Sequence, residues 1–410
     1  MNEKFYNLTG NLLFSLLSLS LFLGLFLNED ASGIGTSNDF KNTWEYVELL
    51  SNGYFIDSSQ WTRLLPFHYI FLSILNEITD SIFSVRFLFC LLSLSIPILF
   101  YLNLKIKYPT IIKGKLIILS SIIIMLPFFR SSAIWPNPHL LSIIFLLISI
   151  YFFQKWKIES KKIIDINLIL HVIFLAFAVY TRRYYVFLFL YYFLYYFQNL
   201  NLKNFYIITF FIFLLSLPGF ILIFNFPFYL QSSGFSLKFY NTILIIPSIF
   251  LLYILPFLKL DFFNLNNKGS KLILIFSLFL VIFLSLFFDY NPKLGGGYFM
   301  KISNIFLKEN YFFYITSLIG IYVLTKISLI KKENIFLIIL IFLTFSNNYM
   351  FQKYFEPLWF IILFLILDLN FLKTCLKSKF QIIIVFIFFT AYSSTALLNS
   401  VYKISLNFFW

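Results

Sequence analysis

Residues 205–224 read F-Y-I-I-T-F-F-I-F-L-L-S-L-P-G-F-I-L-I-F, an apolar run of 20 residues without a charged side chain. A helix needs about 20 such residues to cross a hydrocarbon core about 30 Å thick. Similar runs recur along the whole 410-residue chain. Hydrophobic residues make up 60% of the sequence and charged residues only 12%, against roughly a quarter in an ordinary globular domain. The composition excludes a water-soluble protein and predicts an all-α, polytopic membrane protein.

The apolar runs define the candidate membrane spans. They are residues 8–27, 82–101, 111–128, 138–153, 164–180, 184–197, 205–224, 242–257, 272–288, 311–324, 335–345, 354–367 and 380–397. The sixth and eleventh runs are short, and residues 65–75 could add a further span. We therefore expect about 11 to 13 transmembrane helices in a single transmembrane domain, residues 1–410.

The basic residues predict the orientation of these spans, because cytoplasmic loops are enriched in Lys and Arg. With a cytoplasmic N-terminus, 19 of the 31 basic residues and 6 of the 17 acidic ones fall inside, so the inner side carries +13 of the net charge of +14. We expect the first apolar run to be a retained anchor in a bacterial inner (plasma) membrane. The lysines lie in short loops, which argues for contact with membrane lipids and against nucleic acid as a partner.

The first extracytoplasmic loop, residues 28–81, carries most of the acidic residues that are predicted outside. Residues 40–50 alternate apolar and charged positions at helical spacing, which predicts an amphipathic helix on the membrane surface. Asp39 is the predicted N-cap of this helix and Gly53 its predicted C-terminal stop. A second helix is predicted to start at Pro66. The loop should therefore fold back onto the bilayer.

Several stretches resemble the GT-C membrane glycosyltransferases, in particular the protein O-mannosyltransferases and the aminoarabinose transferases. They are Asp39-Phe-Lys-Asn-Thr-Trp-Glu-Tyr-Val-Glu-Leu-Leu-Ser-Asn-Gly53, Leu65-Pro-Phe-His-Tyr-Ile-Phe-Leu72, Phe83-Ser-Val-Arg86, Ala178-Val-Tyr-Thr-Arg-Arg183 and Gln352-Lys-Tyr-Phe-Glu-Pro357. The family's Asp-Glu pair is Asp39-Phe40 here, which clouds the identity of the catalytic carboxylate. We expect no soluble domain after the last span, which leaves acceptor recognition unassigned.

The resemblance implies that a sugar passes from a polyprenyl-phosphate donor to a glycan, lipid or protein acceptor on the extracytoplasmic face. Such a transfer needs one base, since phosphate is already a good leaving group. Asp39 is the first candidate for that base, although it could be only a helix cap. Asp30 is the alternative, with Glu29 beside it, and both could be plain polar residues that follow a span.

Cationic side chains would bind the phosphate, and all five arginines of the chain are predicted outside. The candidate substrate-binding residues are Arg63, Arg130, Arg182, Arg183, Lys353 and Glu356. For Arg130, Arg182 and Arg183 the alternative role is anchoring at the membrane interface. Lys353 and Glu356 could simply pair with each other. No metal-ligand motif is present, so no cofactor is assigned; a divalent cation held by Asp39 and lipid phosphate stays open.

Two other functional classes compete with the enzyme. A transporter or flippase of lipid-linked oligosaccharide typically has helices broken by Gly or Pro and ionisable groups at mid-membrane. Ionisable residues are almost absent from the middle of the predicted spans, which favours an enzyme acting at the interface. A polysaccharide polymerase would usually carry its large outer loop later in the chain.

Overall fold

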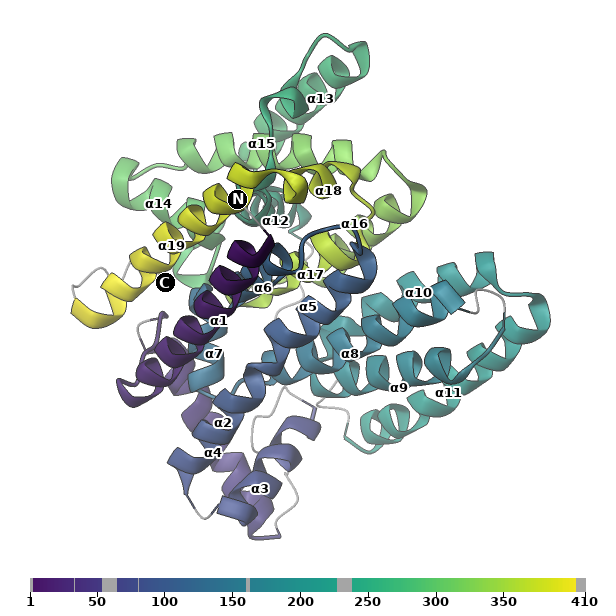
Figure 1. The fold of residues 1–410 in the computed structure, drawn as a ribbon. Helices are drawn as coiled ribbons and strands as arrows, with labels where there is room; N and C mark the ends of the chain where they lie inside the picture. The colour runs from purple at the N-terminus through teal and green to yellow at the C-terminus, as the bar shows by residue number, and fades with distance from the viewer. Residues whose placement is uncertain are drawn as a thin grey trace. The chain divides into compact units, whose positions relative to one another are not determined.

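The computed structural model describes residues 3–32, 34–53, 65–79, 81–159, 163–226 and 238–402. These residues form helices, and no named strand occurs among them. The chain divides into two compact units, Met1–Ser233 and Gly234–Trp410. In Figure 1 the first unit runs from purple to teal and the second from green to yellow. Arg63 lies outside the described residues.

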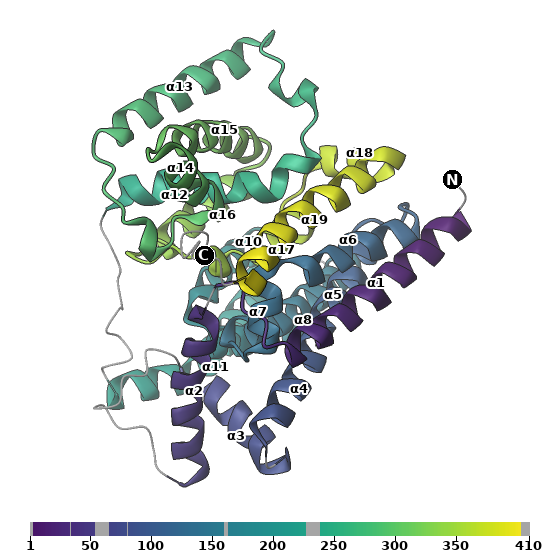
Figure 2. The same cartoon turned by 90° about the vertical axis from the view of Figure 1, so that its left-hand side faces the viewer.

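The first unit contains the long N-terminal helix and the helices of the first loop. Its elements are α1 (Glu3–Phe26), α2 (Gly35–Ser51), α3 (Phe67–Thr79), α4 (Ile82–Ser93), α5 (Ser95–Lys107), α6 (Lys113–Met125), α7 (Pro127–Ile134), α8 (Pro138–Glu159), α9 (Ile166–Thr181), η1 (Arg183–Tyr185), α10 (Val186–Asn199) and α11 (Leu202–Asn225). Helix α1 packs along α6 (Figure 2), and α8 packs along α9 (Figure 1). Gly114 of α6 permits the close contact between α1 and α6, because a Cβ at this position would lie 2.2 Å from the Tyr6 carbonyl oxygen of α1.

The second unit contains the remaining helices. They are α12 (Phe239–Ile254), η3 (Leu255–Phe257), η4 (Leu260–Phe263), α13 (Lys268–Ser285), η5 (Pro292–Leu294), α14 (Gly297–Leu307), α15 (Tyr311–Ser328), α16 (Lys332–Thr344), η6 (Gln352–Tyr354), α17 (Leu358–Ile361), the π-helical η7 (Ile362–Ile366), α18 (Asn370–Lys377) and α19 (Lys379–Tyr402). Glycine again permits close packing, since a Cβ at Gly320 of α15 would lie 2.2 Å from the Pro247 carbonyl oxygen of α12.

All thirteen predicted spans coincide with helical segments, and this confirms an all-helical, polytopic membrane protein. Seven described helices are long and apolar enough to cross a membrane, and two bent helix pairs would raise the number to nine. Residues Ile166–Thr181 and Phe380–Thr395 form shorter apolar helices. Helix α10 has 14 residues and spans only about 21 Å, and α16 is shorter still. The expectation of 11 to 13 transmembrane helices stays a prediction.

One of the bent pairs positions the candidate site. Helices α6 and α7 meet at an angle of 65°. Pro127 is the first residue of α7 and has no backbone N–H to continue the ladder of α6, while Leu126 before it is extended. The bend separates α7, which is buried throughout, from the line of α6. Helix α7 carries Arg130.

Candidate functional site

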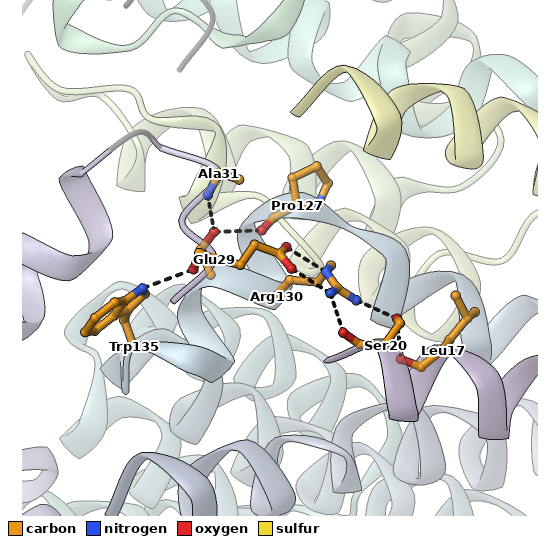
Figure 3. Close-up of polar contacts among 8 residues, drawn as sticks. Leu17, Ser20, Glu29, Ala31, Pro127, Arg130 and Trp135 are labelled. Carbon is orange, nitrogen blue, oxygen red and sulfur yellow. Dashed lines mark hydrogen bonds and ion pairs between the residues drawn. The ribbon is translucent and has the colours of Figure 1, made fainter. Parts of the chain in front are cut away.

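A buried ion pair joins the end of the first span to α7 (Figure 3). Arg130 Nε donates to Glu29 Oε1 at 2.7 Å, and Nη2 donates to Oε2 at 2.6 Å. Both side chains are 7% exposed. Two parallel bonds between a guanidinium and a carboxylate fix the geometry as well as the charge. The pair therefore fixes the chain, where it leaves α1, against a helix about one hundred residues further on.

The backbone around this ion pair is also held. Arg130 donates further to the hydroxyl and the carbonyl oxygen of Ser20, so its guanidinium also contacts α1. Trp135 Nε1 donates to the Glu29 carbonyl oxygen at 3.0 Å, and the Ala31 N–H donates to Ser131 Oγ at 2.8 Å (Figure 3). These bonds bind the start of the first loop to α1 and α7. All three side-chain nitrogens of Arg130 are engaged, which favours a structural role for this residue.

Asp30 holds the beginning of α2. Its Oδ1 accepts from the N–H and the hydroxyl of Ser32, and its Oδ2 accepts from the Ser37 N–H at 2.8 Å. Because Ser37 lies in the first turn of α2, Asp30 satisfies one of the N–H groups that a helix start leaves open.

The predicted N-cap role of Asp39 is wrong. Helix α2 begins four residues earlier, at Gly35, and Asp39 lies within its first two turns. The predicted stop at Gly53 is confirmed by its φ of +77° just after the helix end.

Asp39 is exposed on α2, while the next residue, Phe40, is buried. The opposite face of the helix, including Trp44 and Val47, is buried as well, which confirms the predicted amphipathic pattern. This face packs on protein, and the predicted position of the helix on the membrane surface stays a prediction. The Phe40 ring packs against Trp135, with 6.0 Å between ring centroids. The carboxylate at position 39 is therefore one residue away from the aromatic contact that docks α2.

Arg86 stacks on the Trp135 ring. Its guanidinium carbon is 3.7 Å from the centroid of the Trp135 ring, and its Nε donates to the Ile134 carbonyl oxygen. Arg86 is 7% exposed. Among the described residues, no carboxylate forms an ion pair with it and its Nη2 has no hydrogen-bond partner. Sequence reasoning did not assign Arg86 to the site, although a lone arginine in the first turns of an apolar helix was an available signal.

Arg182 and Arg183 lie between α9 and α10, where Arg182 ends α9 and Arg183 starts η1. Arg182 is 8% exposed and its guanidinium lies 5.4 Å from the Tyr184 ring. It also acts electrostatically on His68 of α3. Burial, with a smaller contribution from the positive charge of Arg182, lowers the pKa of His68 to about 3, so this imidazole is neutral at pH 7. Sequence reasoning missed this proximity because α3 and α9 are far apart in the chain.

Helix α3 turns a mixed polar and apolar face to the protein and leaves apolar side chains exposed. Tyr69, Leu72 and His68 are buried, whereas Ile70 and Ile74 are about half exposed. An exposed isoleucine on a loop that packs on spanning helices suits contact with lipid. The helix therefore presents its mixed face to the protein and apolar side chains to its surroundings.

Glu356 and Lys353, the two predicted site residues of the second unit, contact different groups. Glu356 is 1% exposed, and its Oε2 accepts from the hydroxyls of Tyr253 and Tyr392 at 2.9 and 3.0 Å. Gln352 Nε2 donates to the Tyr253 hydroxyl at 2.7 Å. Lys353 is half-buried, with its Nζ 5.2 Å from the Phe351 ring. Glu356 thus belongs to a buried polar network contributed by α12, η6 and α19.

Three glycines support this network. Gly295, Gly296 and Gly297 all have positive φ, and the Gly296 N–H donates to the Met350 carbonyl oxygen at 3.0 Å. A Cβ at Gly297 would lie 2.5 Å from Ile249. The backbone of these glycines is packed against neighbouring residues because no side chain intervenes. The Gln352 side chain accepts from the Tyr298 N–H next to them.

The described residues contain no group of three or more His, Cys, Asp or Glu side chains that could hold a metal ion. The structure thus brings Glu29, Asp30, Arg130 and the Arg86–Trp135 stack together around the start of the first loop. The positions of Lys353 and Glu356 are defined only within the second unit. No protein-family model, curated protein or solved structure matches this chain.

Proposed function

We propose that this chain is an integral membrane glycosyltransferase of GT-C type. It transfers a sugar from a polyprenyl-phosphate donor to an acceptor on the extracytoplasmic face, with Asp39 as general base. The observation that carries the proposal is the docked first loop: α2 presents an exposed Asp39, and the next residue, Phe40, packs on Trp135, whose ring also stacks with the buried Arg86. A base and an anion-binding group would then lie near one another, where a membrane-bound donor can reach them.

The chemistry needs few groups. The Asp39 carboxylate removes the proton of the acceptor hydroxyl, whose oxygen attacks C1 of the sugar. The bond between C1 and the phosphate oxygen breaks, and the electron pair leaves on the polyprenyl phosphate. Arginine stabilises the departing phosphate by charge-assisted hydrogen bonds. Asp30 and Glu29 are less suited to act as the base, because their carboxylates accept the bonds that hold α2 and Arg130.

The test compares two carboxylates of the same helix. Asp39→Asn and Glu45→Gln each remove one exposed negative charge from α2. The purified protein is placed in vesicles with a polyprenyl-phosphate hexose labelled in the sugar and a cell-envelope extract as acceptor. A general base contributes roughly 100- to 10,000-fold to the rate. We expect Asp39→Asn to lose at least about 100-fold in transfer and Glu45→Gln to stay within about twofold.

Full activity of Asp39→Asn would remove Asp39 from the mechanism. A second candidate function, transport of a lipid-linked sugar, is favoured by the carboxylate of Glu356 buried in a unit of spanning helices. The same vesicles distinguish the two functions. Movement of the labelled lipid across the bilayer without transfer of sugar would overturn the enzyme and support the transporter.

A further inference from the structure

One end of the second unit gathers three connections that are far apart in the sequence. Lys326 Nζ, at the end of α15, donates to the Phe262 carbonyl oxygen at 2.6 Å. The Phe262 ring contacts Phe371 of α18 at 5.4 Å between centroids. Lys331, just before α16, pairs with Asp368, just before α18. The connections between α12 and α13, α15 and α16, and η7 and α18 therefore form one surface.

This surface is strongly basic. We call it the lysine face, and its lysines are Lys259, Lys268, Lys271, Lys326, Lys331, Lys332, Lys373 and Lys377. All are exposed except Lys326, which is half-buried. The acidic residues of the same connections are Asp261, Glu333 and Asp368. The second unit has no arginine, so every fixed positive side-chain charge on the lysine face is an ammonium group.

Helix α18 gives the lysine face its depth in the membrane. The chain turns by 98° between the segment Gln352–Ile366 and α18. Helix α18 buries Leu372, Cys375 and Leu376 and exposes Lys373 and Lys377. A short amphipathic helix at right angles to a span, directly at the end of that span, lies along the membrane surface. The lysines then lie at the level of the lipid headgroups.

We propose that the lysine face binds anionic phospholipids of the adjacent leaflet, with the headgroup phosphates held between Lys373 of α18 and Lys332 of α16. Clustered lysines at the ends of spans attract acidic lipids, and each contributes a gain in affinity near the surface. An ammonium group is a compact point charge that suits a fluid layer of phosphates, and α18, whose apolar side is buried against the protein, keeps Lys373 and Lys377 exposed. This site is independent of the proposed glycosyl transfer.

The experiment measures lipid binding to the full-length protein in detergent by native mass spectrometry. The added lipid is phosphatidylglycerol, and zwitterionic phosphatidylcholine with the same acyl chains serves as the comparison. The test variant is Lys332→Gln with Lys373→Gln. The control variant is Lys293→Gln with Lys308→Gln, which removes the same charge from exposed positions beyond the other ends of α13 and α15.

We expect the wild type to bind phosphatidylglycerol at least about tenfold more tightly than phosphatidylcholine, and the test variant to lose about five- to thirtyfold of that affinity. The control variant should stay within about twofold of the wild type. Equal binding of the two lipids would overturn the proposal, as would an equal loss in both variants. All four lysines are exposed, so the variants should keep the elution volume of the wild type in size-exclusion chromatography.

Discussion

The two units each bury a glutamate, and they satisfy it in different ways. Glu29 receives two bonds from the Arg130 guanidinium. Glu356 receives two tyrosine hydroxyls on one oxygen. The first arrangement places opposite charges in contact, so neither partner can be removed without leaving the other as a buried charge. Hydroxyl groups carry no charge, so removing one partner of Glu356 leaves no unpaired positive charge behind. The second arrangement should therefore tolerate substitution better than the first.

The two clusters also differ in which parts of the chain they hold together. The ion pair and the bonds around it fix the first loop to the helices of its own unit. The tyrosine network lies between three elements of the second unit and is surrounded by aromatic rings, among them Phe360 and Phe389. Substitutions in the two clusters should therefore differ in both stability and activity.

The largest expected effect is the loss of one partner of the ion pair. Glu29→Gln leaves the Arg130 charge buried without its carboxylate and should lower the free energy of unfolding by about 3–5 kcal/mol. The double variant Glu29→Gln with Arg130→Met should recover a large part of that loss, because no unpaired charge remains. Unfolding of the detergent-solubilised protein, followed by tryptophan fluorescence, measures both. A double variant no more stable than Glu29→Gln would contradict a contribution from buried charge.

Gly24 tests how closely α1 approaches the ion pair. A Cβ at this position would lie 2.4 Å from Glu29 Oε2 and 3.0 Å from Arg130 Nη2. Gly24→Ala should cost about 1–3 kcal/mol of stability through overpacking, despite the better helix propensity of alanine. Gly269→Ala is the matched control, since its Cβ would meet nothing closer than 3.5 Å. If the two variants are equally stable, the ion pair must adjust easily.

The tyrosine network should respond in a graded manner. Tyr253→Phe removes a donor to Glu356 and the acceptor of Gln352, and should cost about 1–3 kcal/mol. Tyr392→Phe removes its bond to Glu356 and should cost about 0.5–1.5 kcal/mol. Glu356→Gln keeps an oxygen acceptor and should cost about 1 kcal/mol, well below Glu29→Gln. Thermal unfolding of the three variants ranks them, and a loss for Glu356→Gln as large as for Glu29→Gln would remove the distinction between the two clusters.

The last prediction concerns the pH dependence of stability that Lys301 on α14 sets, since this lysine has no acidic partner among the described residues. Burial lowers the pKa of its ammonium group to about 8, from the ordinary value of 10.5. Between these two values the unfolded chain binds more protons than the folded one, so stability should rise with pH from about 8 to about 10.5. Melting temperatures of the wild type and Lys301→Met across this range isolate the contribution. An identical pH dependence in both proteins would show that Lys301 is well hydrated.

Much of the fold could be predicted from local pattern. Apolar runs predicted the positions of the helical segments, and the spacing of residues 40–50 predicted the buried face of α2. The start of α2 could not be predicted, because Asp30 caps it across an irregular stretch rather than from the adjoining position. The site could be predicted only in part. Glu29 and Arg130 are about one hundred residues apart, and no local pattern indicates that they meet.

The sequence by itself determined that this is a polytopic, all-helical membrane protein, because hydrophobicity and helix length depend on adjacent residues. It also pointed to the first loop as the place where polar chemistry gathers. Tertiary structure decided which of those polar groups hold the protein together and which stay exposed. Asp30 accepts from backbone N–H groups and Glu29 from Arg130, and the Asp39 side chain is exposed on α2. Which polar groups are buried depends on which distant helices pack together. A buried charge is stable only when such a helix supplies its partner.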